Sequence, residues 1–152
     1  MEQFRSHVLV CTGGGCIASG ALAVSAAFSE ELKTKGLAEE VQVVETGCLG
    51  PCAVGPVALI YPDGVFYQNI KVPDVAEIVE EHLLKGRVVT RLVSHAPGTD
   101  KSTAEMHDVE FFNRQVKIVL RNSGLIDPLK IEDYIARDGY AALAKALVEM
   151  TP

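Results

Sequence analysis

Four cysteines stand in two close pairs near the start of the chain. Four residues separate Cys11 from Cys16, and three separate Cys48 from Cys52. Loops this short let two thiolates reach the same metal ion, and two such pairs suit the four ligands of a [2Fe–2S] cluster. Five glycines adjoin the cysteines, where they let the backbone approach closely and direct N–H groups at sulfur: Gly13, Gly14, Gly15, Gly47 and Gly50.

Other uses of the four thiols are possible. A zinc-stabilised interaction module is the main structural alternative, although zinc-binding pairs usually show two intervening residues at least once. A thiol–disulfide catalyst would carry Cys-x-x-Cys, and the chain lacks that motif. Buried cysteines without a ligand role would not account for four of them in glycine-rich loops. The spacing therefore favours an iron–sulfur site and leaves zinc as the alternative.

The elements around the first three cysteines can be read from periodicity. Residues 6–11 form an apolar strand that ends on Cys11, and the glycines of 13–15 predict a loop closed by Cys16. A helix is expected from Ser19, with apolar residues at spacings of three and four, until Gly36. A second strand over 41–45 then leads into Cys48.

Two further strands and a second helix complete an α/β unit. Residues 57–61 and 65–70 predict a hairpin around Pro62-Asp63-Gly64, and an apolar stripe from Val75 to Leu83 predicts a helix that ends at Gly86. The element order is β-α-β-β-α. If the first two strands are parallel, their carboxyl ends lie at one edge of the sheet. Both cysteine pairs would then meet there.

The rest of the chain is predicted to be helical after a polar connection. Residues 1–93 form the α/β domain, 94–108 are turn-rich and predict a linker, and 109–152 form a short all-helical tail. Within the tail, helices are expected over 109–121, from Asp127-Pro128 onward, and over 140–150.

Composition narrows the class of protein. The chain is 48% hydrophobic and 22% charged, with a formal net charge of −6. This profile is typical of a globular protein and offers no basic field for nucleic acid. The sequence shows neither a membrane span nor a signal peptide, which predicts a cytoplasmic location, where thiols stay reduced.

Histidines and glutamates outside the cysteine loops suggest simpler roles. The histidines are His7, His82, His95 and His107. A Rieske centre would use two of them in place of two thiols, but four suitably spaced thiols are already present. His82 falls on the apolar side of its helix and is expected to pack in the core, whereas Glu77, Glu80 and Glu81 predict a solvated helix face.

Longer motifs around the cysteines resemble a known family. Cys11-x4-Cys16 and the run from Gly47 to Pro56 resemble the thioredoxin-like [2Fe–2S] ferredoxins. Further runs, over residues 57–67, 75–83, 115–124 and 126–140, resemble one setting of that domain. This setting is the N-terminal part of the NADH-binding flavoprotein subunit of complex I-like enzymes, especially the beta subunits of cytoplasmic multimeric and bifurcating hydrogenases.

The resemblance implies a thioredoxin-like ferredoxin domain that carries one electron on one [2Fe–2S] cluster ligated by the four cysteines. It implies partners among the iron–sulfur or flavin subunits of a multimeric NADH-linked oxidoreductase or hydrogenase, and possible self-association through the tail. In that family a glycine-rich flavin domain and a second, four-cysteine cluster region follow. The sequence shows neither motif, so no FMN, NAD or [4Fe–4S] site and no catalytic residue is expected in this chain.

Overall fold

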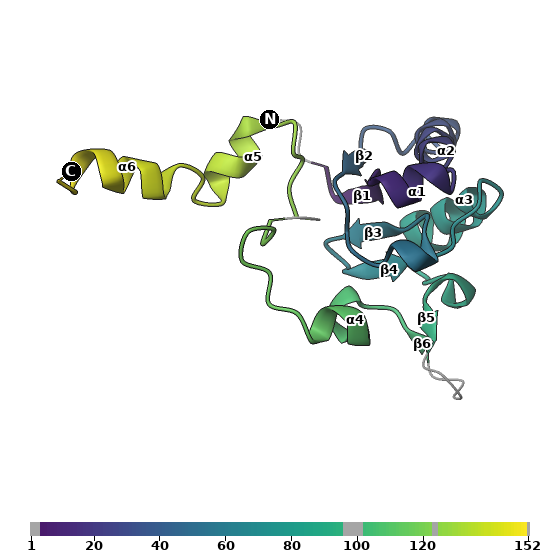
Figure 1. The fold of residues 1–152 in the computed structure, drawn as a ribbon. Coiled ribbons are helices and arrows are strands. Elements are labelled where there is room, and N and C mark those ends of the chain that lie inside the picture. Colours follow the sequence, from purple (N-terminus) through teal and green to yellow (C-terminus); the bar gives the residue numbers. More distant parts are fainter. Residues whose placement is uncertain (1–3, 96–101, 123–124, 152) are drawn as a thin grey trace.

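The centre of the molecule is a four-stranded mixed sheet. The computed structural model describes residues 4–95, 102–122 and 125–151. The strand order is β2-β1-β3-β4, with β1 parallel to β2 and the other neighbours antiparallel. The strands are β1 (Ser6–Cys11), β2 (Val41–Thr46), β3 (Ala58–Tyr61) and β4 (Val65–Tyr67). The expected strand pairing is therefore present (Figure 1), although β4 ends three residues earlier than predicted.

The inner strand and its crossover helix follow directly from the sequence pattern. β1 has strand neighbours on both sides, and Val8 and Val10 are fully buried. Helix α2 (Ala21–Thr34) joins the two parallel strands and buries the apolar face expected from its spacing. Gly36 follows with φ +69, the left-handed conformation that ends many helices.

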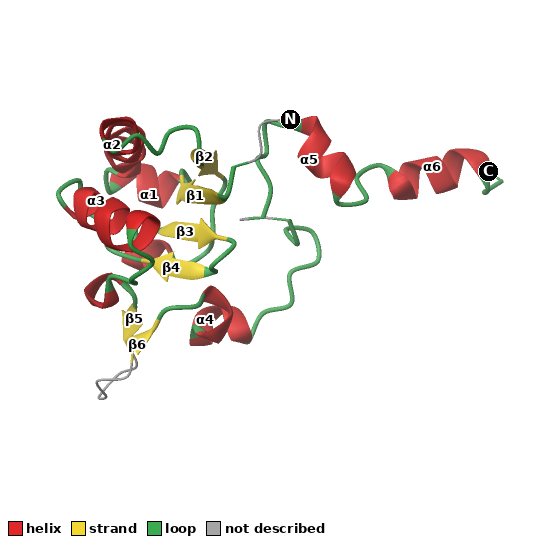
Figure 2. Ribbon diagram, turned by 180° about the vertical axis from the view of Figure 1, so that it is seen from behind, coloured by secondary structure: helices red, strands yellow, loops and turns green. Residues whose placement is uncertain are grey.

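A second helix packs beside α2 on the sheet. It begins as α3 (Asp74–Glu77) and continues in wider π-helical turns over Ile78–Leu84. Its buried residues are Val75, Ile78, Val79, His82 and Leu83, which is the predicted apolar stripe. α2 contacts α3 as well as β1 and β2, so the two long helices and the sheet enclose one core (Figure 2).

The connection predicted as a linker carries structure of its own. After a 3-10 turn at Thr90–Leu92, β5 (Ser94–His95) pairs with β6 (Ser102–Thr103), and a second turn covers Met106–Asp108. The Phe66 N–H donates to the Ala104 carbonyl at 2.8 Å. The Met106 N–H donates to the Gly64 carbonyl at 2.8 Å. The described part of 94–108 is therefore attached to the free edge of the sheet.

The tail departs most from prediction. The helix expected over 109–121 is a single turn, α4 (Glu110–Asn113), because the described part of the chain leaves the apolar residues after it largely uncovered: Val116 and Val119 are about nine-tenths exposed. An isolated short helix with several β-branched residues is not stable in water. The helix expected at Pro128 begins later, as α5 (Ile131–Ala136), and α6 (Ala141–Val148) matches the third prediction.

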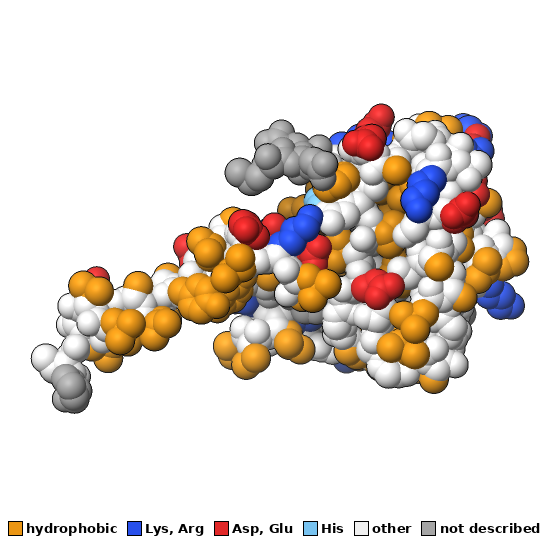
Figure 3. Space-filling view, turned by 90° about the horizontal axis from the view of Figure 1, so that it is seen from above, with side chains coloured by type: hydrophobic (Ala, Val, Ile, Leu, Met, Phe, Trp, Pro, Cys, Tyr) orange, Lys and Arg blue, Asp and Glu red, His pale blue; other side chains and the backbone are white. Residues whose placement is uncertain are grey.

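Apolar side chains remain on the surface of this tail. Figure 3 shows them along the part of the molecule that extends from the sheet, and they include Leu143, Leu147 and Val148 of α6. Among the described residues, no helix combines the length and the apolar character needed to cross a membrane.

His82 is a buried core residue, as predicted, and it belongs to a hydrogen-bond chain. The Tyr67 hydroxyl accepts a hydrogen bond from the Val89 N–H at 3.1 Å and lies 2.9 Å from His82 Nδ1. Burial raises the pKa of Tyr67 to about 12, so this hydroxyl keeps its proton and can donate it to His82. His82 Nε2 lies 3.1 Å from a carboxylate oxygen of Asp63. These hydrogen bonds connect the interior with the hairpin turn.

Stability is expected to fall in mild acid because of His82. Burial lowers its pKa below the ordinary 6.5, although the Asp63 carboxylate partly opposes this shift. The unfolded chain then binds a proton more readily than the native one, so stability drops as pH falls through about 6.5 and levels off below the native pKa. His82→Gln should reduce the pH dependence of the thermal midpoint between about pH 7 and 5. The same change at the exposed His107 should not reduce it. Equal slopes of the thermal midpoint against pH in the two variants would contradict the prediction.

Candidate metal centre

The two cysteine loops leave the sheet at the same edge. Cys11 is the last residue of β1 and pairs in register with Thr46, the last residue of β2. The backbone N–H and the hydroxyl of Thr12 both donate to the Thr46 carbonyl, each at 2.9 Å. These bonds hold the start of the first loop against the start of the second. The parallel pairing expected from the sequence therefore brings the loops together.

Cys16 lies on a short helix where a loop was predicted. Residues Gly14–Ala18 form α1, and Gly13 caps it in an extended conformation. The Ile17 N–H donates to the Gly13 carbonyl at 3.0 Å, which closes the first turn. The loop prediction for 13–15 was wrong because glycine permits a helical conformation that it does not favour by itself. The helix directs Cys16 into the core.

Three glycines allow the loops to touch. A Cβ placed on Gly13 would lie 3.0 Å from the Cys48 Cβ. A Cβ on Gly15 would lie 3.2 Å from the Cys52 Cβ, so the first loop sits directly on the second cysteine pair. Gly55 was not singled out from the sequence, yet a Cβ there would lie 2.9 Å from Cys16 Sγ. Its position three residues after Cys52 was the available signal.

The other glycines near the cysteines serve differently. At Gly14 and Gly47 a Cβ would meet no protein atom within 4 Å, so contact with the described chain does not require glycine there. Gly50 has φ +122, a conformation that residues with a side chain rarely adopt. The space that a Gly50 side chain would enter is taken by Phe111 from the tail.

The four sulfurs form one buried and one exposed pair. Cys11 and Cys16 are each 1% exposed, and burial followed by the hydrogen bond with Cys11 raises the pKa of Cys16 to about 11. A hydrogen bond from the Val57 N–H partly offsets this rise. Cys48 and Cys52 are exposed, with their sulfurs 3.6 Å apart, and contact with Cys48 raises the pKa of the Cys52 thiol. Positively charged metal is what would keep such thiols ionised.

The grouping of the sulfurs bears on whether the site suits one metal ion or two. Four sulfurs on a single tetrahedral zinc, each bonded at about 2.3 Å, lie roughly 3.8 Å from one another. Within the described residues, the sole trio of potential ligand atoms that lie within 4.8 Å of one another is Glu105, His107 and Asp108. No three cysteine sulfurs are that close. The Cys48 and Cys52 sulfurs lie 3.6 Å apart, and Cys16 hydrogen-bonds to Cys11. This grouping by pairs suits the two irons of a [2Fe–2S] core and gives no support to a single zinc ion.

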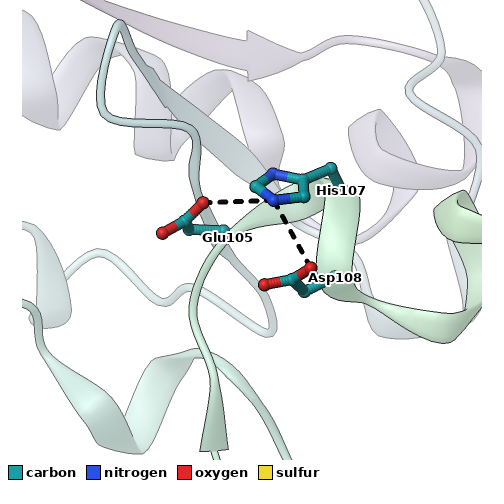
Figure 4. Close-up of side chains that lie close together, drawn as sticks. All are labelled: Glu105, His107 and Asp108. Atoms are coloured by element: carbon teal, nitrogen blue, oxygen red, sulfur yellow. Dashed lines mark ion pairs between the residues drawn. The ribbon is translucent and has the colours of Figure 1, made fainter.

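Glu105, His107 and Asp108 form an exposed ion-pair group at the 3-10 turn before α4 (Figure 4). His107 Nε2 lies 3.3 Å from a Glu105 oxygen and 3.4 Å from an Asp108 oxygen. No sequence pattern predicted this group. All three side chains are more than half exposed, and ion pairs of this kind are common on protein surfaces.

Of the four histidines, His7 and His82 lie away from the cysteine loops, whereas His95 lines a cavity together with Pro51 of the second loop. His7 is near the opposite end of β1 from Cys11, and His82 is engaged with Tyr67 and Asp63. The acidic residues predicted to face solvent do so and form surface ion pairs with Lys35, Lys85, Arg87 and Arg91. They are Glu77, Glu80 and Glu81.

Replacing Gly13 with alanine is expected to impair cluster assembly. Gly13 has φ −63 and ψ 155, which alanine tolerates, so the added methyl acts through its 3.0 Å approach to Cys48 alone. Iron and acid-labile sulfide per chain should fall after purification under argon. Gly14→Ala is the matched control, because within the described chain its methyl meets no atom within 4 Å beyond its chain neighbours and its own helix backbone. Equal iron content in the two variants would show that the close approach is unimportant.

Comparison with known proteins agrees with this geometry. A family model described as thioredoxin-like [2Fe–2S] ferredoxin matches residues 2–83. A 2Fe–2S ferredoxin of Clostridium pasteurianum is 41% identical over 100 residues, covering 60% of this chain and 98% of that protein. One from Aquifex aeolicus is 41% identical over 102 residues, covering 61% of this chain and 91% of its own length.

Solved structures and one longer protein extend the comparison. The crystal structure of the thioredoxin-like [2Fe–2S] ferredoxin from Aquifex aeolicus superposes with a TM-score of 0.57 at 38% identity. The superposition covers 62% of this chain and all of the Aquifex aeolicus chain. The NADP-reducing hydrogenase subunit HndC of Solidesulfovibrio fructosivorans is 56% identical over 39 residues, which are 26% of this chain and 8% of that subunit. The chain therefore belongs to the thioredoxin-like [2Fe–2S] ferredoxin family and is an iron–sulfur electron carrier.

Proposed function

We propose that Cys11, Cys16, Cys48 and Cys52 ligate one [2Fe–2S] cluster, and that the chain relays single electrons within an NAD(P)H-linked oxidoreductase or hydrogenase complex. The observation that carries the ligand assignment is the arrangement of sulfurs in two compact pairs at one sheet edge. Each pair suits one iron, since a [2Fe–2S] core takes two thiolates per iron. When bound, the cluster supplies one-electron oxidation and reduction.

The two pairs have different tasks in this proposal. Cys11 and Cys16 lie in the core and hold their side of the site away from water. Cys48 and Cys52 are exposed, so a redox partner can approach the site from their side. Electron transfer needs no bond chemistry at the protein, so thiols and backbone groups suffice for this task.

The wider setting rests on two observations. A 39-residue stretch of this chain is 56% identical to part of HndC, a hydrogenase subunit described as NADP-reducing, and this similarity supports such a setting. The tail exposes many large apolar side chains that a partner could cover. Iron–sulfur or flavin subunits are the proposed partners, and the division into a domain over 1–93, a connection over 94–108 and a docking segment over 109–152 belongs to the same proposal. A cytoplasmic location does too.

Metal analysis combined with EPR tests the ligand assignment. Purification under argon should give about two irons and two sulfides per chain and visible charge-transfer absorbance. Reduction with dithionite should produce the EPR signal of a single unpaired electron per cluster, at a low potential of about −400 mV. Equimolar zinc in a colourless protein, with no such signal, would overturn the proposal. The zinc alternative has no support from the family match or from the sulfur spacing.

Co-purification tests the setting. Tagged protein should retain a flavin- or iron–sulfur-containing subunit from its native host, identified by mass spectrometry and by flavin fluorescence. The control variant carries Leu143→Asp and Leu147→Asp on α6, which removes exposed apolar surface without touching the core. Equal recovery with both proteins would count against docking through α6, and recovery of no redox subunit would count against the complex.

A further inference from the structure

Helix α4 of the tail lies beside the second cysteine loop and is anchored to the sheet. Backbone hydrogen bonds tie Ala104 and Met106 to the edge of β4. A few residues later Phe112 is buried at 7% exposure, and its ring stands edge-on to Phe66 with centroids 5.1 Å apart. Aromatic pairs of this geometry stabilise a contact beyond the area that they bury. α4 is therefore held in a defined place on the sheet.

Anchoring through Phe112 leaves the adjacent Phe111 against the second cysteine loop. A Cβ on Gly50 would lie 2.7 Å from Phe111 Cε1 and 3.1 Å from Cζ, so the ring lies over the Gly50 backbone. Gly50 is midway between Cys48 and Cys52, the exposed pair. Beside the ring, Pro51 and Val54 line a cavity of about 360 Å³ together with Phe111. The aromatic ring is thus next to the loop that carries both exposed thiols.

Two properties make this contact relevant to the thiols. Gly50 has φ +122, so the loop adopts a conformation that its own sequence does not enforce and that an outside contact can hold. The ring also removes water from one side of the loop while remaining 42% exposed itself. Residues that order a loop around a metal site and limit its solvation influence both the retention of the metal and its potential.

We propose that Phe111 is a positioning residue for the exposed ligand pair: its ring clamps Gly50, keeps Cys48 and Cys52 in register, and limits water at the outer side of the cluster. This inference rests on the proposed function, since it assumes that the two thiols hold iron. It assigns to the tail a part in the cluster site that does not depend on any partner subunit.

Phe111→Ala tests the inference in the full-length holoprotein. Cluster loss is followed by bleaching of visible absorbance with excess chelator, and the midpoint potential by EPR-monitored redox titration. The variant should lose its cluster several-fold faster than the unmodified protein. Its potential should become less negative, because water stabilises the charge added on reduction. Phe111→Leu keeps an apolar side chain over Gly50 and should restore most of both properties.

Phe4→Ala is the matched control. Phe4 also makes an aromatic contact, with His7 at 6.1 Å between centroids, but it precedes β1 at the end away from Cys11. Phe4→Ala should leave the rate of cluster loss and the midpoint potential unchanged. The inference is overturned, while the proposed function stands, if Phe111→Ala has the same rate of cluster loss and the same midpoint potential as the unmodified protein. It is also overturned if Phe111→Ala leaves the potential unchanged and loses its cluster no faster than Phe4→Ala. Absence of a [2Fe–2S] signal in the unmodified protein would instead overturn the proposed function first.

Discussion

Replacing Cys16 with alanine is expected to leave the purified protein without its [2Fe–2S] cluster. The side chain is 1% exposed and fixed by α1, with Gly55 packed against its sulfur, so solvent water has little access to replace the lost ligand. The remaining buried thiol, Cys11, cannot complete an iron site alone. Iron and sulfide should fall close to zero, and the visible absorbance and the EPR signal should disappear together.

The neighbouring Ile17 supplies the control for this experiment. It shares α1 with Cys16 but is 44% exposed, so Ile17→Ala changes the same helix without removing a sulfur. That variant should keep the iron content of the unmodified protein. A Cys16→Ala protein with about two irons and an unchanged EPR spectrum would remove Cys16 from the ligand set.

Truncating Phe28 to alanine is expected to produce the largest loss of stability among single changes in α2. Phe28 is fully buried on the face of the helix that packs on the sheet. Removing a buried phenyl ring eliminates its apolar burial and leaves a cavity, which together cost roughly 3–5 kcal/mol. Domains of this size are stable by only about 5–15 kcal/mol, so thermal and urea midpoints should drop strongly. Both are measured by circular dichroism.

Leu22→Ala on the same helix tests whether burial is the cause. Leu22 is 49% exposed, and the substitution also replaces a large apolar residue with the best helix former. Its cost should be within about 0.5 kcal/mol of zero, as for most surface changes. Similar losses for both variants would mean that α2 does not bury its face as the structure shows.

Several elements could be predicted because their signals are local. The strand over Ser6–Cys11 has the predicted limits, since an apolar run bounded by glycine has few other solutions. The helix ending near Gly36 was predicted from residue spacing and from a glycine that takes up a left-handed conformation. The burial of His82 followed from its place on an apolar stripe.

Other elements could not be predicted because distant contacts decide them. The tail residues 114–122 have an apolar pattern, but no surface in the described chain covers it, so a helix longer than one turn gains too little to form. Residues 102–106 read as polar connection, yet the unpaired edge of β4 offered hydrogen bonds to their backbone. An edge strand accepts a neighbour through main-chain groups, which leave no mark on side-chain composition.

The four cysteines of the proposed cluster site could be identified from the sequence, because thiol identity and short loop spacing are local properties of the chain. The sequence also determined that both loops follow strands, since the apolar runs and glycines stand next to the cysteines. The burial of Cys11 and Cys16 and the exposure of Cys48 and Cys52 follow from the folded arrangement and not from any local pattern. The tertiary structure alone placed Gly55 at Cys16 and Phe111 over Gly50. Such contacts join residues tens of positions apart, and they depend on strand pairing and helix docking, which no local pattern encodes.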